Sequence, residues 1–333
     1  MKITLLGNFY VDYTSETHHK KSLEALGHEV IALQESRATS DQVLEAAQNS
    51  QLFIWIHTHG WDTPGTIGMK RVLDILKDAG IPTLSYHLDL WLGLERQKDI
   101  YKDDVWSIEY FFTADKNFAE WLCNNTKIKG RYMPAGVFHE ECIMLPPDNG
   151  KKYDVIFVGS KGYHPEWPYR PKLINWLQDT YGDRFAHFGG DGLGVVRGMD
   201  LNQTYSNAKV VVGDTLCINY NYPNYFSDRL FETTGRGGAL IFPYIDGLEN
   251  LFNITDTSLV GAYSEYDEGT PFTEVLTYKF NHFKELKEKI DNLIDDANVR
   301  ESVRRNGFFR TKENHTYKHR WGAILKEVFN GKA

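Results

Sequence analysis

Short apolar segments alternate with segments of helical spacing along most of the chain. Residues 2–7 are apolar and β-prone, residues 15–26 place apolar side chains at helical intervals, and residues 28–33 are apolar again. Gly27 is suited to end the intervening helix, because glycine tolerates the left-handed backbone common at helix ends. The pattern predicts a βαβ unit, in which a helix connects two parallel strands.

The same alternation continues through the first half of the sequence. Further strands are expected at 52–58, 82–87, 110–113 and 130–133, and further helices at 40–47, 67–79 and 117–124. Strands that alternate with helices in this way favour a parallel sheet covered by helices on both faces.

Residues 140–152 interrupt this rhythm. They contain Pro146, Pro147 and Gly150 and show no periodicity, which predicts a linker. Beyond the linker the alternation starts again, with strands expected at 153–159, 185–189, 209–213 and 239–242 and helices at 171–180, 202–207 and 228–235. A second doubly wound parallel sheet follows from the same reasoning as the first.

The last part of the chain is helical, at 282–296 and 299–328, with no strand after it. The sequence thus predicts an α/β protein with two Rossmann-like domains, residues 1–142 and residues 151–312. A helix within 313–333 is expected to pack back on the first domain.

Composition narrows the class of protein. Of 333 residues, 41% are hydrophobic and 25% charged, which predicts a globular protein and not a disordered one. The net charge of −8 argues against general affinity for nucleic acid, which depends on clustered cations. Residues 271–333, however, contain thirteen basic and nine acidic residues, so a local basic surface is expected near the carboxyl terminus.

Neither a membrane span nor a disulfide framework is indicated. The longest apolar runs, 52–56 and 155–158, are far shorter than a bilayer requires, and the amino terminus lacks the features of a signal peptide. Cys123, Cys142 and Cys217 form no CxxC pair, so a structural zinc site is not expected. A cytoplasmic protein fits best, in the host cytoplasm if a phage encodes it.

Candidate ligand-binding residues follow the strands of the second half. In parallel sheets, ligands bind beyond the carboxyl ends of the strands. Glycine-rich loops follow the expected strands at 159–162 and 189–192, and another glycine cluster lies within 227–238. Small residues let a ligand approach the backbone, and amides at helix starts attract phosphate. Such loops are equally compatible with ordinary turns.

The segment 227–238, with the sequence SDRLFETTGRGG, combines charge with a helix end. Arg229 and Glu232 are three positions apart, so they share one face of a helix. The arginine can neutralise a diphosphate, and the carboxylate one turn later can accept ribose hydroxyls. The alternative is an ion pair within the helix, on a solvated face.

In the first half, His87 and Asp89 lie at the end of the expected strand 82–87, where a side chain can act as a general base on a bound ligand. His57, near the end of the expected strand 52–58, and His59, just after it, come next. These residues have structural alternatives, because the histidines can be buried at the edge of a core and Asp89 can cap a helix.

Several segments resemble the group-1 glycosyltransferases of the GT-B fold, and most closely their spore-maturation (CgeB-like) branch and phage relatives. The resemblance rests on YMPAGVFHEE at 132–141, DVIFVGS at 154–160, YSNAKVVVGD at 205–214, SDRLFETTGRGGALIF at 227–242 and HTYKHR at 315–320. It implies two domains that face each other across a cleft, with a nucleotide-sugar donor in the second domain and an acceptor in the first.

The resemblance also implies roles for individual residues of the donor site. Glu232 would hold the ribose, and Arg229 and Lys161 the diphosphate. The remaining candidates are the strand-end residues Gly159 and Ser160, the amides near Gly237 and Gly238, and Tyr225, whose ring would stack on the donor base or pack in the core. Retaining members commonly carry a second acid where this chain has Asn224, which leaves the stereochemical outcome open.

The expected activity is transfer of a sugar, with a UDP-sugar favoured as donor, to a hydroxyl group. The sequence has no DxD triplet, so neither a metal nor a cofactor besides the nucleotide sugar is expected. The acceptor would be either a glycan or a hydroxymethylated pyrimidine in phage duplex DNA. For DNA, basic contacts would come from the region 300–320 and from Lys20, Lys21, Lys70 and Arg71. The alternative function is a non-catalytic nucleotide-binding or sensing module.

Overall fold

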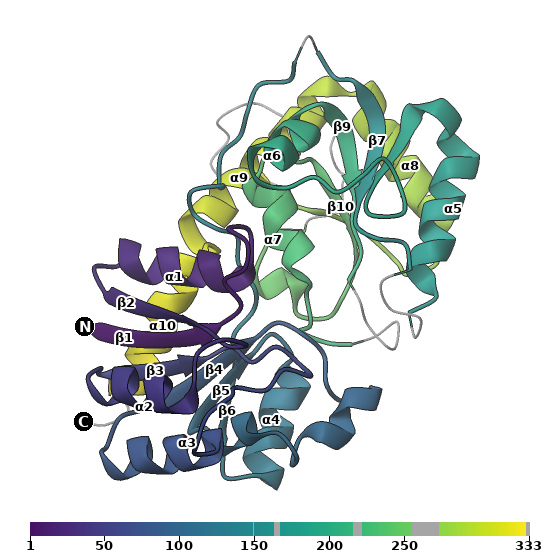
Figure 1. Cartoon of the computed structure of the whole chain (residues 1–333). Helices are drawn as coiled ribbons and strands as arrows, with labels where there is room; N and C mark the ends of the chain where they lie inside the picture. The colour runs from purple at the N-terminus through teal and green to yellow at the C-terminus, as the bar shows by residue number, and fades with distance from the viewer. Residues whose placement is uncertain (149, 163–166, 216–221, 255–272, 331–333) are drawn as a thin grey trace. The chain divides into compact units, whose positions relative to one another are not determined.

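The computed structural model describes residues 1–148, 150–162, 167–215, 222–254 and 273–330. The chain divides into two compact units. The first unit is Met1–Phe138 together with the chain from Tyr317 onward, and the second is His139–Thr316. Each unit is built around its own parallel β-sheet (Figure 1).

The first unit has strands and helices in regular alternation. Its elements are β1 (Lys2–Gly7), α1 (Ser15–Ala25), β2 (Glu29–Gln34), α2 (Ser40–Gln48), β3 (Leu52–Trp55), α3 (Met69–Asp78), β4 (Thr83–His87), η1 (Glu95–Asp99), η2 (Asp104–Ser107), β5 (Tyr110–Thr113), α4 (Lys116–Asn125), β6 (Lys129–Tyr132) and α10 (Tyr317–Asn330). The strands are parallel, in the order β2-β1-β3-β4-β5-β6. This agrees with the βαβ pattern of the sequence.

Alternating side chains of the strands fill a separate core on each face of this sheet. Phe53 and Trp55 of β3 point to the face covered by α2, α3 and α4, where they pack with Val72 and Phe118. Ile54, from the same strand, belongs to the opposite core under α1 and α10. Both faces are therefore buried, as expected of a parallel sheet.

The last helix, α10, is part of the first unit's core and lies beside α1 (Figure 1). Trp321 is fully buried, and its indole Nε1 lies 3.1 Å from Nδ1 of His19. Burial lowers the pKa of His19 to about 3, so this ring is neutral and can accept the indole proton. Arg320 donates from Nε to the carbonyl of Ala135 at 2.9 Å. The apolar stripe of α10 thus covers one face of the first sheet.

The second unit repeats the architecture. Its elements are β7 (Tyr153–Val158), α5 (Tyr169–Tyr181), η3 (Gly182–Arg184), β8 (Phe185–Phe188), α6 (Gly198–Ser206), β9 (Ala208–Val212), α7 (Asp228–Gly235), β10 (Leu240–Pro243), η4 (Leu248–Asn250), β11 (Leu276–Tyr278), α8 (Phe283–Asp295) and α9 (Ala297–Asn314). The strands are parallel, in the order β11-β10-β9-β7-β8. Two parallel sheets flanked by helices confirm the predicted α/β fold class.

One strand and one linker differ from the expectation. The sequence did not predict β11, a short edge strand beside β10 whose three residues carry little periodicity. The segment 140–152, predicted as a linker, is held against the second unit by its backbone. The side-chain amide of Asn202 donates to the carbonyls of Glu141 and Ile143, and Ser206 donates to that of Leu145.

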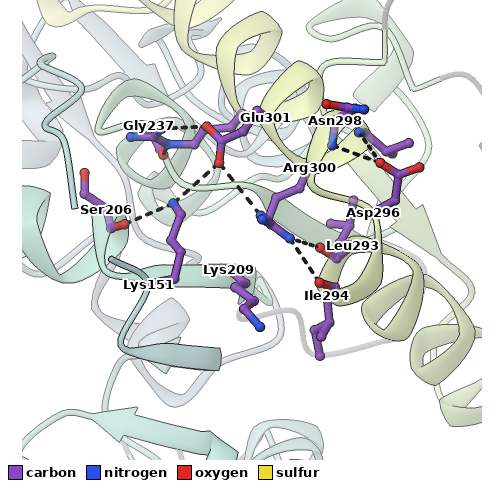
Figure 2. Close-up of polar contacts among 12 residues, drawn as sticks. Lys151, Ser206, Lys209, Gly237, Leu293, Ile294, Asp296, Asn298, Arg300 and Glu301 are labelled. Carbon is purple, nitrogen blue, oxygen red and sulfur yellow. Dashed lines mark hydrogen bonds and ion pairs between the residues drawn. The ribbon is translucent and has the colours of Figure 1, made fainter. Parts of the chain in front are cut away.

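A cluster of charged side chains continues this attachment (Figure 2). Lys151 donates to the carbonyl of Ser206 at 3.0 Å and lies 3.6 Å from the carboxylate of Glu301. Arg304 bonds the same carboxylate at 2.8 Å and the carbonyl of Leu145 at 2.8 Å. Burial and the nearby Arg304 lower the pKa of Lys151 to about 8. The cluster connects the start of β7 to α9 within the second unit.

Within the described residues, no helix is long and apolar enough to cross a membrane.

A buried ion pair joins the loops at the carboxyl edge of the second sheet. Asp214, directly after β9, is fully buried, and Nε of Arg170 lies 3.0 Å from each of its carboxylate oxygens. Trp167 donates to the same carboxylate at 3.2 Å, and Arg170 also donates to the carbonyl of Ser160. The pair thereby connects α5 and the loop after β7 to the end of β9.

We expect Asp214→Ala to lower the free energy of unfolding of the second unit by about 3–5 kcal/mol, because Arg170 would be left buried without a counter-charge. Urea unfolding followed by circular dichroism measures the change. The matched control is Glu288→Ala, which removes one partner of the exposed ion pair with Lys284 and should leave the midpoint almost unchanged. Equal midpoints for Asp214→Ala and the wild type would contradict the structural role.

Candidate functional site

Arg229 and Gly159 meet at the carboxyl edge of the second sheet. Gly159 follows β7 with φ of 145°, a backbone conformation that favours glycine. Arg229, in the first turn of α7, donates from Nη1 to the carbonyl of Val158 at 2.8 Å. A Cβ atom on Gly159 would lie 2.9 Å from the guanidinium carbon. Glycine at this position therefore makes room for the arginine at the end of the strand.

Arg229 keeps its charge in this position. Burial opposes ionisation, but the carboxylates of Asp228, Asp214 and Glu232 nearby outweigh it and raise the pKa of the guanidinium. A cation at the carboxyl end of a parallel strand, beside the amino end of a helix, favours an anionic ligand.

The loop after β7 brings Lys161 to the same edge. Its backbone is fixed by Asp191, whose carboxylate accepts the amide of Lys161 at 2.8 Å and that of Gly162 at 3.2 Å. Burial raises the pKa of the Asp191 carboxyl. The hydrogen bonds from the two amides and the nearby His187 lower it by more, so the pKa lies below its usual value. The amides of Lys161 and Gly162 are therefore engaged within the protein. The side chain of Lys161, which bonds Asn175, is the cationic group that this loop can offer to a ligand.

Glu232 lies one turn beyond Arg229 on α7, with its side chain 25% exposed. Its ion pair is with Arg236, at 3.7 Å, four residues further along the helix. Arg236 is buried and is also bound by the carboxylate of Glu141 and the side chain of Asn202. Glu232 therefore shares Arg236 with Glu141, and its own side chain stays partly exposed.

Gly237 and Gly238 lie at the opposite end of α7. Their amides donate to the carbonyls of Thr234 at 3.0 Å and Thr233 at 2.8 Å, which closes the carboxyl end of the helix. Gly237 has φ of 77°, and a Cβ atom there would lie 2.5 Å from the side chain of Met144. Both amides are already hydrogen-bonded, so we leave them out of the proposed diphosphate site.

Tyr225 is buried, with its ring 5.9 Å from that of Tyr222 at an angle of 77°. The neighbouring Asn224 has φ of 58°, and its side-chain amide lies against Gly247. The structure thus places Tyr225 beside Tyr222 and Asn224 in a turn. Residues 216–221, which include Cys217, lie outside the described residues, as do residues 163–166.

The first sheet carries a second group of polar side chains at its carboxyl edge. His57 follows β3 and is buried, with Nδ1 2.5 Å from Oε1 of Glu35. His87 ends β4, and its Nε2 lies 2.9 Å from the carbonyl oxygen of His57. Asp89 is 51% exposed, 3.9 Å from Nδ1 of His87 and 3.3 Å from Arg96. The structure brings these sequence-predicted residues together.

His59 lies apart from the hydrogen bonds of this group, with Nε2 3.8 Å from the carboxylate of Asp99.

His87 is neutral at neutral pH. Burial lowers the pKa of its imidazole, and the opposing effect of Asp89 does not restore it. The rings of Trp91 and Phe111 pack near its own, with centroids 5.8 and 6.0 Å away. A neutral, half-buried histidine can accept a proton from a bound hydroxyl group.

Sequence reasoning missed two carboxylates in this group, Glu35 and Glu16. Glu35 directly follows β2, so the rule used for His57 and His87 could have found it. Glu16 is in the first turn of α1, and its side chain packs against Gly7 at the end of β1. Burial raises the pKa of Glu16 to about 7. No local pattern in the sequence distinguishes Glu16 from an ordinary helix-start acid.

In the part of the chain that the structure describes, no group of three or more His, Cys, Asp or Glu side chains could hold a metal ion. The expected independence of a metal stays a prediction.

Comparison with known proteins identifies the family. The model of a glycosyl transferase-like family matches residues 152–326. A comparison with curated protein sequences gave no match.

Solved structures resemble the chain along its whole length. An alpha-glucosyltransferase in complex with UDP and a 13-mer DNA containing an HMU base is 11% identical, with a TM-score of 0.62, and the match covers 98% of this chain and 99% of that one. HepE of Anabaena, in complex with UDP-glucose, is 13% identical at a TM-score of 0.63, covering 99% and 100%. Sucrose-phosphate synthase from Thermosynechococcus elongatus is 12% identical at a TM-score of 0.59, covering 99% of both chains.

These likenesses confirm the GT-B fold, while the relation to the spore-maturation branch stays a prediction. Because the family match spans more than half of the sequence, the chain belongs to the glycosyl transferase-like family and is a group-1 glycosyltransferase of the GT-B fold.

Proposed function

We propose that the protein transfers a sugar from a UDP-sugar, bound by the second unit, to a hydroxyl group of an acceptor bound by the first. The observation that carries the proposal is the position of Arg229 against Gly159 at the end of β7, beside the loop of Lys161. Cleavage of the donor develops negative charge on the leaving diphosphate, and cations placed there in advance stabilise the transition state. No metal and no other cofactor is needed for this role.

Glu232 suits the ribose of the donor. Its partly exposed carboxylate can accept hydrogen bonds from two vicinal hydroxyls, and it lies one helical turn from Arg229, the cation proposed to bind the diphosphate. UDP as the nucleotide is supported by the complexes of HepE with UDP-glucose and of the alpha-glucosyltransferase with UDP.

His87 is the proposed base that removes the proton from the acceptor hydroxyl. It is neutral, half-buried and beside the exposed Asp89, which can stabilise the imidazolium that forms. His57 is buried and bonded to Glu35, so we assign it a supporting role.

We favour a glycan over duplex DNA as the acceptor. The basic region 300–320 was expected to offer a surface for a nucleic acid strand. Arg300, Arg304 and Arg320 are instead buried and donate to backbone carbonyls. Buried arginines cannot neutralise phosphates, so this region supplies less affinity for DNA than its sequence suggests.

For the donor site, we expect Glu232→Ala to raise the KM for the UDP-sugar by roughly 10- to 100-fold, because hydrogen bonds from the ribose to a charged group are lost, at about 1.5–3 kcal/mol. Steady-state kinetics and calorimetric binding of UDP measure the change. The matched control is Glu288→Ala, on the exposed face of α8, which should leave KM unchanged. A normal KM in Glu232→Ala would remove Glu232 from the donor site.

For the base, kcat should fall as the pH drops through the lowered pKa of His87, because the neutral imidazole is the active form. We expect His87→Gln to reduce kcat by about 100-fold or more, to leave the donor KM unchanged, and to abolish this acidic limb. A pH–kcat profile of each variant tests the assignment. Loss of the limb in Glu16→Gln, with His87→Gln still showing it, would instead identify Glu16 as the base.

For the acceptor, we expect UDP release to be stimulated by oligosaccharides with free hydroxyls and not by duplex DNA containing hydroxymethylated pyrimidines. A gel shift at increasing salt measures DNA binding independently of turnover. Tight, salt-dependent binding of the modified duplex, together with sugar transfer to it, would reverse the choice of acceptor.

A further inference from the structure

The peptide unit between His57 and Thr58 is hydrogen-bonded at both ends by titratable side chains. The amide of Thr58 donates to Oε2 of Glu35 at 2.8 Å. The carbonyl oxygen of His57 lies 2.9 Å from Nε2 of His87. Because that carbonyl and that amide belong to one planar, conjugated group, Glu35 and His87 are connected through a single peptide bond.

Glu35 is firmly held. It is fully buried, and its Oε1 accepts the indole proton of Trp55 at 2.7 Å and lies 2.5 Å from Nδ1 of His57. Burying a carboxylate is costly unless donors surround it, and the donors from Trp55, His57 and Thr58 meet that need. A carboxylate without exposed surface does not reach an acceptor itself, so its effect on chemistry passes through the groups it binds.

The arrangement decides which nitrogen of His87 carries the proton. A carbonyl oxygen can only accept, so the Nε2 of His87 is the donor in this bond. A neutral imidazole has one N–H, which leaves the lone pair on Nδ1, the nitrogen on the side of Asp89. The carboxylate at the amide end polarises the peptide and strengthens the bond that its carbonyl accepts.

We infer that Glu35 is a positioning residue that, through the 57–58 peptide, holds His87 in the Nε2–H tautomer with Nδ1 free to accept the proton of the acceptor hydroxyl. The catalytic part of this inference rests on the proposed role of His87. The tautomer itself follows from the hydrogen bonds and does not depend on that role.

Several other charged or titratable groups face His87, and each bears on its titration. Asp89 and Arg96 lie in the loop that follows His87, His57 follows the adjacent strand, and His19 lies on α1. Asp89 and the hydrogen bond to the carbonyl of His57 favour the imidazolium, whereas the ring of His57 and Arg96 disfavour it. The negative charge of Glu35, carried to the carbonyl through the peptide, acts in the same direction as Asp89.

The first experiment is nuclear magnetic resonance of the intact chain labelled with ¹⁵N-histidine, with His87 assigned from His87→Gln. We expect the neutral Nε2–H tautomer for His87 in the wild type. A predominant Nδ1–H tautomer would overturn the inference without any further variant.

The second measurement uses Glu35→Gln, which keeps the size of the side chain and removes its charge. We expect the pKa of His87 to fall by roughly half a unit or more, since the charged form loses a stabilising carboxylate. His57→Phe removes the imidazole and keeps the 57–58 peptide, so it should shift this pKa much less. An equal or larger shift in His57→Phe would show that the effect passes through the ring of His57 and not through the peptide.

Measurements of activity distinguish a failure of this inference from a failure of the proposed function. We expect Glu35→Gln to lower kcat about tenfold with an unchanged donor KM and to move the acidic limb of the profile with the pKa of His87. Trp55→Phe removes another donor to Glu35 without altering the peptide and should leave the profile unmoved. If His87→Gln keeps full kcat while the tautomer and pKa shift behave as stated, the proposed base is wrong and the positioning by Glu35 stands.

Discussion

The parallel direction of the strands is the constraint from which both candidate sites follow. In a parallel sheet every carboxyl end reaches the same edge, so residues far apart in the sequence meet there. In the first unit this brings Glu35, His57 and His87 together from the ends of β2, β3 and β4. In the second unit it brings the loop of Lys161, Asp214 and the start of α7 together beyond β7 and β9. In neither group are the residues close together in the sequence.

Burial divides the carboxylates of these edges into two kinds. Glu35 and Asp214 are fully buried and surrounded by donors, so they hold loops in place. Glu232 and Asp89 keep side-chain surface exposed, which a ligand could reach. A buried carboxylate must be satisfied by the protein itself, because water cannot reach it. The difference between holding a loop and binding a substrate is therefore one of solvent access and not of residue type.

The basic carboxyl-terminal region shows how charge in a sequence differs from charge on a surface. Arg300 and Arg304 donate hydrogen bonds to backbone carbonyls of the second unit, and Arg320 donates one to a backbone carbonyl of the first. Their long side chains close the ends of helices and hold the segment before β7. The net positive count of this region consequently overstates its attraction for an anionic polymer.

The alternation of apolar segments was sufficient to determine the α/β class, the parallel sheets and almost every helix, since strand and helix periods are local properties of the sequence. It also placed His57 and His87 at strand ends, whereas Arg229 and Glu232 were singled out by their spacing on one face of an expected helix beside a glycine cluster. Only the tertiary structure decided which side chains are buried and which groups they pair with. The sequence could not show that the amides of Gly237 and Gly238 close a helix, that Glu16 is desolvated, or that Arg304 faces inward. Solvent access and hydrogen-bond partners arise from contacts between distant segments, and no local pattern encodes those contacts.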